Sequence, residues 1–325
     1  MKSQRYNLWK EEEYNYPRAY GFVPNIVSYL HDDTAIRPCI VVAPGGGYRI
    51  VSPTEGEIVA KKFYEKGYNA FVCTYTTNIT GLAVLGMQPL NDLSRAVRFI
   101  RSKAKQFCID PEKLVVCGFS AAGHLCASLC VHYEDVEDPV YGAYSNRPDA
   151  AILSYPVITV GEKAHRDSFT ALLGENASAD ELEYMSLETQ VKKNTPPCFL
   201  WQTAEDELVP VENSYLFAQA CLEKGVPFAH HVFPFGSHGL SLADEDWSNR
   251  KYGVPYTREQ SERVLEQIKN GQLHLPADRE ENVRNDCNEN GVQDLAEKRP
   301  PMPDVAVWPD LADTWIKTVL KNISV

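Results

Sequence analysis

The sequence predicts an α/β fold in which a mainly parallel sheet is covered by helices on both faces. Short continuous apolar runs, typical of strands buried on both sides, alternate along the chain with helical patterns. Glycine and proline residues separate many of these runs. Strands that alternate with helices are typical of a parallel sheet with helical crossover connections. We therefore expect one α/β domain that spans residues 1–325.

The expected elements follow one another in a regular order. The apolar runs predict strands at Val23–Leu30 (at a sheet edge), Pro38–Ala43, Asn69–Tyr75, from Asp110–Pro111 up to Ser120, Ala150–Tyr155, Cys198–Thr203 and Phe228–Phe233. The helical patterns cover Glu55–Gly67, Asn91–Phe107, the stretch after Ser120 through Val131, Val211–Lys224 and Pro309–Lys321. In the second helix, Leu93, Val97 and Ile100 fall on one face, which predicts an amphipathic helix against the sheet.

Two segments interrupt this alternation. Residues 157–197 contain no clear strand pattern, and we expect them to form a lid or pocket wall at the mouth of the sheet. Residues 249–305 are polar and loop-rich, with one helical pattern near Thr257–Lys269. We interpret this second segment as an insertion before the last helix.

The composition indicates which binding partners and which cellular compartment to expect. The formal net charge is −12, which argues against nucleic acid and against an anionic membrane surface. The first residues are polar and lack the apolar core of a signal peptide, and no window is apolar enough to cross a bilayer. Most of the nine cysteines lie within predicted strands or helices, as buried free thiols do. These features predict a cytoplasmic protein, and they leave self-association into a homo-oligomer open.

A serine at a strand-to-helix turn is the centre of the sequence. The apolar run that ends at Phe119 leads directly to Ser120, and small residues surround this serine. A nucleophile elbow needs this strand, turn and helix, with small residues two positions before and after the serine. Gly118 fills the first position, and Ala122 with Gly123 fills the second. Ser120 is therefore the candidate nucleophile, although a serine in an ordinary turn is the simpler alternative.

A serine nucleophile needs a base and a carboxylate that orients the base. On a sheet of this kind the chain order is serine, acid, histidine, with the acid and the histidine after late strands. Asp206 follows the strand Cys198–Thr203, and His238 follows the strand Phe228–Phe233. We therefore predict Asp206 as the acid and His238 as the base. The alternatives are Glu205 and Glu207 for the acid, and His124, His230 and His231 for the base.

Acyl transfer also requires N–H donors for the oxyanion. One donor is expected from Ala121, the residue after the nucleophile, and others from a glycine loop after an early strand. Gly45, Gly46 and Gly47 follow the strand Pro38–Ala43. The pattern is neither a dinucleotide-binding fingerprint nor a phosphate-binding P-loop. Tyr48 next to the loop either lines the acyl pocket or packs in the core.

Taken together, these residues resemble the α/β-hydrolase superfamily, in particular esterases and lipases similar to bacterial acetylxylan and feruloyl esterases. The motifs that carry the resemblance are Pro44–Tyr48, Asp110–Pro111 with Gly118–His124, Glu205–Asp206 with Val209–Ser214, and Phe233–Pro234 with Ser237–Leu240. The resemblance implies that the N–H groups of Gly46 and Gly47 join that of Ala121 as oxyanion donors. It also implies a fold that needs neither a cofactor nor a metal ion.

The leading hypothesis is a serine carboxylesterase that hydrolyses short acyl esters, in particular acetyl esters of small molecules or oligosaccharides. An amidase or peptidase on the same fold is the first alternative. A binding protein that has lost catalysis on a hydrolase scaffold is the second, and it predicts a broken set of catalytic residues. All the candidate residues are present in this chain.

One further motif lies in the insertion. Residues Asp286–Glu297 match the D-x-[DN]-x-[DN]-G-x5-E pattern of a calcium-binding loop. Gln293 at the eighth position and the following Pro300–Pro301 weigh against a working calcium site. We therefore favour a solvated polar loop, and we expect any calcium bound there to be structural.

Overall fold

The computed structural model describes residues 1–10, 12–289 and 298–323. An eight-stranded sheet forms its centre, with the strand order β1-β2-β4-β3-β5-β6-β7-β8. The strands are β1 Arg5–Asn7, β2 Asn25–Tyr29, β3 Arg37–Ala43, β4 Asn69–Thr74, β5 Ile109–Phe119, β6 Ala150–Ser154, β7 Cys198–Thr203 and β8 Phe228–Phe233. In this spatial order, all neighbouring strands from β4 to β8 are parallel. β2 pairs antiparallel with both of its neighbours, β1 and β4. The predicted α/β fold with a mainly parallel sheet is therefore confirmed.

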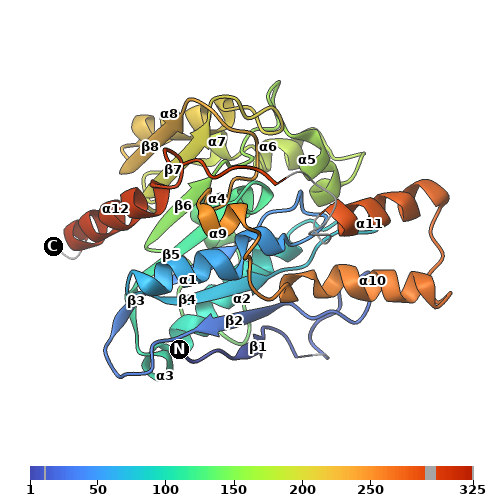
Figure 1. Ribbon diagram of the computed structural model, residues 1–325, viewed down its shortest axis with the longest axis horizontal. Coiled ribbons are helices and arrows are strands. Elements are labelled where there is room, and N and C mark those ends of the chain that lie inside the picture. The colour runs from blue at the N-terminus through green and yellow to red at the C-terminus, as the bar shows by residue number, and fades with distance from the viewer. Residues whose placement is uncertain (11, 290–297, 324–325) are drawn as a thin grey trace.

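Helices surround the sheet and extend beyond it (Figure 1). The described helices are α1 Glu57–Glu65, α2 Gln88–Ser102, α3 Ala104–Phe107, α4 Ala121–His132, α5 Arg166–Leu173, α6 Ala179–Tyr184, α7 Leu187–Gln190, α8 Glu212–Lys224, α9 Glu245–Ser248, α10 Glu259–Lys269, α11 Ala277–Glu289 and α12 Trp308–Ile323. Three short 3-10 helices are η1 Pro53–Glu55, η2 Tyr133–Asp135 and η3 Tyr256–Arg258. Among the described helices, none is long and apolar enough to cross a membrane.

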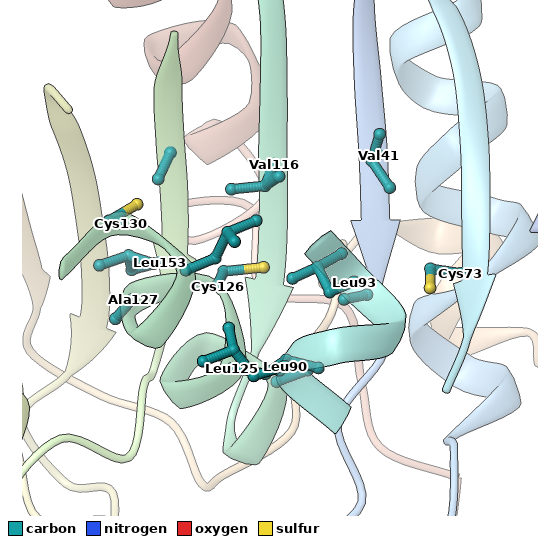
Figure 2. Packing of buried hydrophobic residues seen from close by; sticks show 14 of the residues in the cluster. Val41, Cys73, Leu90, Leu93, Val116, Leu125, Cys126, Ala127, Cys130 and Leu153 are labelled. Atoms are coloured by element: carbon teal, nitrogen blue, oxygen red, sulfur yellow. The ribbon is translucent and has the colours of Figure 1, made fainter. Parts of the chain in front are cut away.

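Two apolar clusters fill the space between the sheet and its helices. On one face, α2 and α4 contribute Leu93 and Leu125, which pack with Val116 of β5 (Figure 2). On the other face, α1 and α12 pack against the same strands. Leu93 is fully buried, and burial of a side chain of this size contributes about 2 kcal/mol. The two clusters hold the central strands, and with them the turn after β5, in a fixed position.

Several local predictions differ from the structure. The strand at Val23–Leu30 is not at the edge, because β1 pairs with β2 on its outer side. The predicted helix Asn91–Phe107 is two helices, since α2 ends at Ser102 and α3 begins at Ala104. The predicted free thiols are confirmed: the nine cysteines are all free, and all except Cys108 are buried.

The two interrupting segments contain more helix than their sequences suggest. Residues 157–197 contain the helices α5, α6 and α7. Residues 249–305 contain α11 in addition to α10, the helix that the sequence predicts. In Figure 1, α10 and α11 lie side by side and project from one end of the sheet. A small third cluster, centred on Val264, Ile268 and Val283, attaches this pair to Ile50 in the glycine loop. The insertion is thus packed against the loop that follows β3.

Candidate active site

Ser120 occupies the tight turn between β5 and α4. Its backbone has φ 53° and ψ −121°, a conformation that residues other than glycine rarely adopt. Three backbone hydrogen bonds hold this strained turn. The Ser120 N–H donates to Ser154 O (3.0 Å), and Ser120 O accepts from Val157 N (3.1 Å) and His124 N (3.2 Å). The turn therefore fixes the hydroxyl beyond the carboxyl end of the sheet.

Glycine is required on both sides of this turn. A Cβ atom on Gly118 would lie 2.0 Å from Ala122 O, and one on Gly123 would lie 2.7 Å from Pro156 Cβ. Real Cβ atoms essentially never approach other heavy atoms so closely. Ala122, which replaces the second glycine of the strict motif, is fully buried. The close contact that demands glycine on this side is thus at Gly123.

A chain of hydrogen bonds joins Ser120 to the predicted base and acid. Ser120 Oγ lies 2.7 Å from His238 Nε2, and His238 Nδ1 lies 2.7 Å from Asp206 Oδ2. A carboxylate accepts, so Nδ1 carries the proton and Nε2 is free to accept from the serine hydroxyl. The second oxygen, Asp206 Oδ1, accepts from the N–H groups of Leu208 (3.1 Å) and Val209 (2.9 Å). The Asp206 side chain is only 1% exposed, so both of its oxygens are held in place.

The rival residues lie elsewhere. Glu205 and Glu207 are exposed, and the carboxylate of Glu205 accepts from Gly236 N at 3.4 Å. His230 forms a hydrogen bond with Ser214 on α8, and His231 packs against Phe199. Among the described residues, Asp206 and His238 are the acid and the histidine that the fold brings to Ser120.

The glycine loop borders the same cavity as Ser120. Gly46 has φ +127° and Gly47 has φ +63°, and a Cβ on Gly46 would lie 2.4 Å from Ile50 O. Both positions therefore suit glycine, and both line the cavity. Ala121 begins α4, so its N–H is one of the first-turn donors that have no acceptor within their own helix. The three predicted oxyanion donors thus come from the loop after β3 and the helix after β5.

The idea that Tyr48 lines the acyl pocket is wrong. Its side chain is 2% exposed, and its hydroxyl lies 2.8 Å from His124 Nδ1 in the core. His124 Nε2 donates to Met185 O at 3.0 Å, so Nδ1 accepts from the tyrosine hydroxyl and the ring is neutral. Burial lowers the pKa of His124 to about 4. Tyr48 and His124 therefore anchor the glycine loop to α4.

A buried glutamate connects three loops of the site. Glu55 Oε2 accepts from Gly45 N, and Oε1 accepts from the Tyr155 hydroxyl, both at 2.7 Å. The same hydroxyl accepts from Ser241 N at 3.1 Å, and the Tyr155 ring packs edge-on against His238 with centroids 4.9 Å apart. Burial raises the pKa of Glu55, while hydrogen bonds from Tyr155 and Gly45 oppose that rise.

A cavity of about 560 Å³ opens beside Ser120 and His238. This volume is in the range of small-molecule sites, about 300–1,000 Å³. Its lining includes residues of the stretch 46–55 and, from the insertion, Arg250, Tyr252 and Arg258. His165 and Asp167, from the segment 157–197, also line it, and burial lowers the pKa of His165.

The comparisons with known proteins identify the family of this chain. The BD-FAE family matches residues 28–221, which is more than half of the chain. The chain belongs to the BD-FAE family. Gly46, Gly47, Ser120 and Asp206 lie inside the matched range, and His238 follows it in sequence but meets Ser120 in space.

Two curated proteins resemble this BD-FAE chain over most of its length. Endo-1,4-beta-xylanase B of Butyrivibrio fibrisolvens is 55% identical over 81% of this chain and 42% of that protein. The acetylxylan esterase of Xylanibacter ruminicola is 28% identical over 83% of this chain and 52% of that protein. The chain thus spans about half the length of these relatives, or less.

Solved structures show the same fold. An acetyl ester-xyloside bifunctional hydrolase from Caldicellulosiruptor lactoaceticus has a TM-score of 0.69 and 38% identity, over 83% of this chain and 97% of that one. The α/β hydrolase MGS-M1, from a deep-sea metagenome library, has a TM-score of 0.65 and 25% identity, over 99% and 98% of the two chains. The fold is that of the α/β hydrolases.

The calcium-loop motif receives no support from the described residues. Asp286, its first position, lies within α11 and accepts from Arg49 Nε at 2.6 Å. Residues 290–297 of the motif lie outside the described residues. Within the described ranges, no group of three or more His, Cys, Asp or Glu side chains is arranged to hold a metal ion.

Sequence reasoning missed Glu55, Tyr155, His165 and the arginines of the cavity. Glu55 lies near the start of a predicted helix, where an acid is ordinarily a solvated first-turn residue. Its partner Tyr155 is 100 residues away and ends a predicted strand. The position of Tyr155 could have pointed to the site, because residues directly after parallel strands gather at the carboxyl edge of the sheet, where ligands bind.

Proposed function

We propose that this chain is a serine carboxylesterase that hydrolyses short acyl esters of carbohydrates, in particular acetyl esters. The observation that carries the proposal is the chain of two 2.7 Å hydrogen bonds through Ser120, His238 and Asp206. The acetylxylan esterase and the acetyl ester-xyloside hydrolase among its relatives support the acetyl group and the carbohydrate.

The reaction uses the residues in these roles. His238 Nε2 takes the proton of Ser120 as the oxygen attacks the ester carbonyl, and Asp206 stabilises the imidazolium that forms. The N–H groups of Gly46, Gly47 and Ala121 stabilise the oxyanion. As the ester C–O bond breaks, His238 protonates the departing sugar oxygen, so the sugar leaves as an alcohol and the acyl group stays on Ser120. Water, deprotonated by His238, releases the acid and restores the serine.

The charged side chains in the cavity lining favour a small acyl group on a polar alcohol. Arginine, aspartate and histidine side chains share the lining with apolar and aromatic ones, among them Ile50, Leu208, Trp247 and Tyr252. A long alkyl chain would bury charged groups without partners, which is unfavourable. We therefore expect acetyl esters to be hydrolysed faster than decanoyl esters.

The same cavity does not favour cleavage of the glycosidic bond, although one relative is named a xylanase. Glycosidases use two carboxyl groups on opposite sides of the bond. Here Glu55 is occupied by Gly45 and Tyr155, and Asp286 is bound to Arg49. We expect acetate release from acetylated xylan without shortening of the xylan chain.

The test is hydrolysis of p-nitrophenyl acetate by the wild type and by Ser120→Ala. We expect kcat to fall by about 10³-fold or more, as for other serine nucleophiles, with an unchanged circular dichroism spectrum. Acetanilide, assayed beside it, distinguishes an amidase from an esterase. A folded Ser120→Ala variant that retains a near-native rate would overturn the proposal.

A further inference from the structure

The charges around the cavity contrast with the charge of the chain. The protein carries 44 acidic residues against 32 lysines and arginines. Yet among the described residues the cations that line the cavity are all arginines, namely Arg49, Arg250, Arg258 and Arg299. The carboxylates that line it are Glu55, Asp167 and Asp286.

Two of these carboxylates are engaged by the protein itself. Glu55 is 4% exposed, and its two oxygens accept from Gly45 and Tyr155. Asp286 Oδ2 accepts from Arg49 at 2.6 Å, which neutralises one arginine as well. The third, Asp167, is exposed at the cavity mouth. Of the arginines in the lining, Arg49 is thus paired with a carboxylate of the same cavity.

Arg258 and Arg299 contact neutral groups. Arg258 Nη2 donates to the carbonyl of Cys287 at 2.9 Å, which fixes the guanidinium against α11. Arg299 donates to the carbonyls of His238 and Gly239, both at 2.8 Å. Within the described part of the chain, neither side chain forms a salt bridge. A guanidinium has five N–H donors, so each of the two retains donors for a ligand.

We infer that this wall binds a carboxylate on the alcohol part of the ester, so that the preferred substrate is a carbohydrate ester that bears a uronic acid. The inference rests on the proposed esterase function. A guanidinium binds a carboxylate through two parallel hydrogen bonds, and the attraction is screened less in a half-enclosed cavity than on an open surface. Both arginines come from the insertion: Arg299 contacts the backbone of His238, and Arg258 contacts the backbone of Cys287. The acidic sugar would thus lie between the insertion and the histidine loop.

The first test compares two esters that differ only in the carboxylate: the monoacetates of methyl glucuronoside and methyl glucoside. We expect kcat/KM to be at least about tenfold higher for the glucuronoside at low salt. The preference should shrink at 0.5 M NaCl, because salt screens the attraction. Equal values for the two esters would overturn the inference.

The second test assigns the preference to the insertion wall. In Arg258→Gln, the amide can still donate to Cys287 O, but the charge is lost. We expect KM for the glucuronoside to rise about tenfold, with a much smaller change for the glucoside. Arg263→Gln is the matched control, since Arg263 is an exposed arginine on α10 that pairs with Glu259 away from the cavity. Equal losses on both esters would show a structural role for Arg258 and contradict the inference.

The two tests also separate this inference from the proposed function. If the wild type hydrolyses p-nitrophenyl acetate and methyl glucoside acetate but shows no preference for the acid, only the inference fails. If it hydrolyses no acetyl ester, the proposed function fails. Inhibition by inorganic phosphate without inhibition by glucuronate would show an anion site of another kind, and would also overturn the uronic acid assignment.

Discussion

The two walls of the cavity are built in different ways. The wall formed by the ends of β3 and β5 includes Gly46, which has no room for a Cβ, and a serine at φ +53°. The other wall comes from the insertion, whose helices α10 and α11 attach to the domain through a small apolar cluster around Val264 and Val283. The comparison indicates that core packing fixes the candidate catalytic residues, whereas a separately packed element carries the side chains that we propose for recognition.

The largest effect is expected from a substitution of Asp206, the candidate acid. Asp206→Asn should reduce kcat on p-nitrophenyl acetate by about 10³-fold or more, because the amide no longer holds the histidine tautomer that accepts the serine proton. Glu207→Gln, a change of an exposed neighbouring acid, is the control and should remain close to wild type. The opposite ranking of the two variants would contradict the assignment of Asp206.

The grouping of Ser120, Asp206 and His238 was predictable from the sequence, whereas the wall formed by the insertion was not. The serine, the acid and the histidine each follow an apolar strand, so their order and spacing reveal them. In contrast, α11 has only Val283 and Cys287 as buried apolar residues, four positions apart in an otherwise polar stretch. Such a pattern resembles a solvated loop, and its helix depends on tertiary packing. β1 is three residues long and gave no periodic signal.

The second prediction concerns acid stability of the buried wall. Folding lowers the pKa of His124 from 6.5 to about 4. Between these two pH values, the unfolded chain therefore binds more protons at this residue than the folded protein does. The free energy of unfolding therefore falls as the pH decreases through this window, by about 3 kcal/mol from this residue. Denaturant unfolding of the wild type and of His124→Gln at pH 7 and pH 4.5 measures the difference. A variant with the same pH dependence as the wild type would rule out this role.

The third prediction tests whether Glu55 positions the site. In Glu55→Gln, one carboxylate oxygen is replaced by an NH2 group, which donates and does not accept. The side chain therefore loses one of its two hydrogen bonds, either the one from Gly45 N or the one from the Tyr155 hydroxyl. We expect kcat to fall about tenfold with little change in KM, because the glycine loop and the ring against His238 lose their shared anchor. A change confined to KM would instead place Glu55 in substrate binding.

The smallest effect is expected in the insertion wall. Val283→Ala removes two methyl groups from the third cluster, which weakens the attachment of α11 by about 1–2 kcal/mol. Amide hydrogen exchange should become faster in α10 and α11, while kcat on p-nitrophenyl acetate stays within about twofold of wild type. A loss of kcat as large as that in Glu55→Gln would show that the two walls are not independent.

The central claim is that Ser120 is the nucleophile, and covalent labelling tests it most directly. The wild type is treated with a fluorophosphonate, and the modified peptide is located by mass spectrometry. The account predicts one adduct per chain, on Ser120, and almost none in His238→Ala, where the base is absent. Labelling of another residue, or no labelling of a folded wild-type protein, would contradict it.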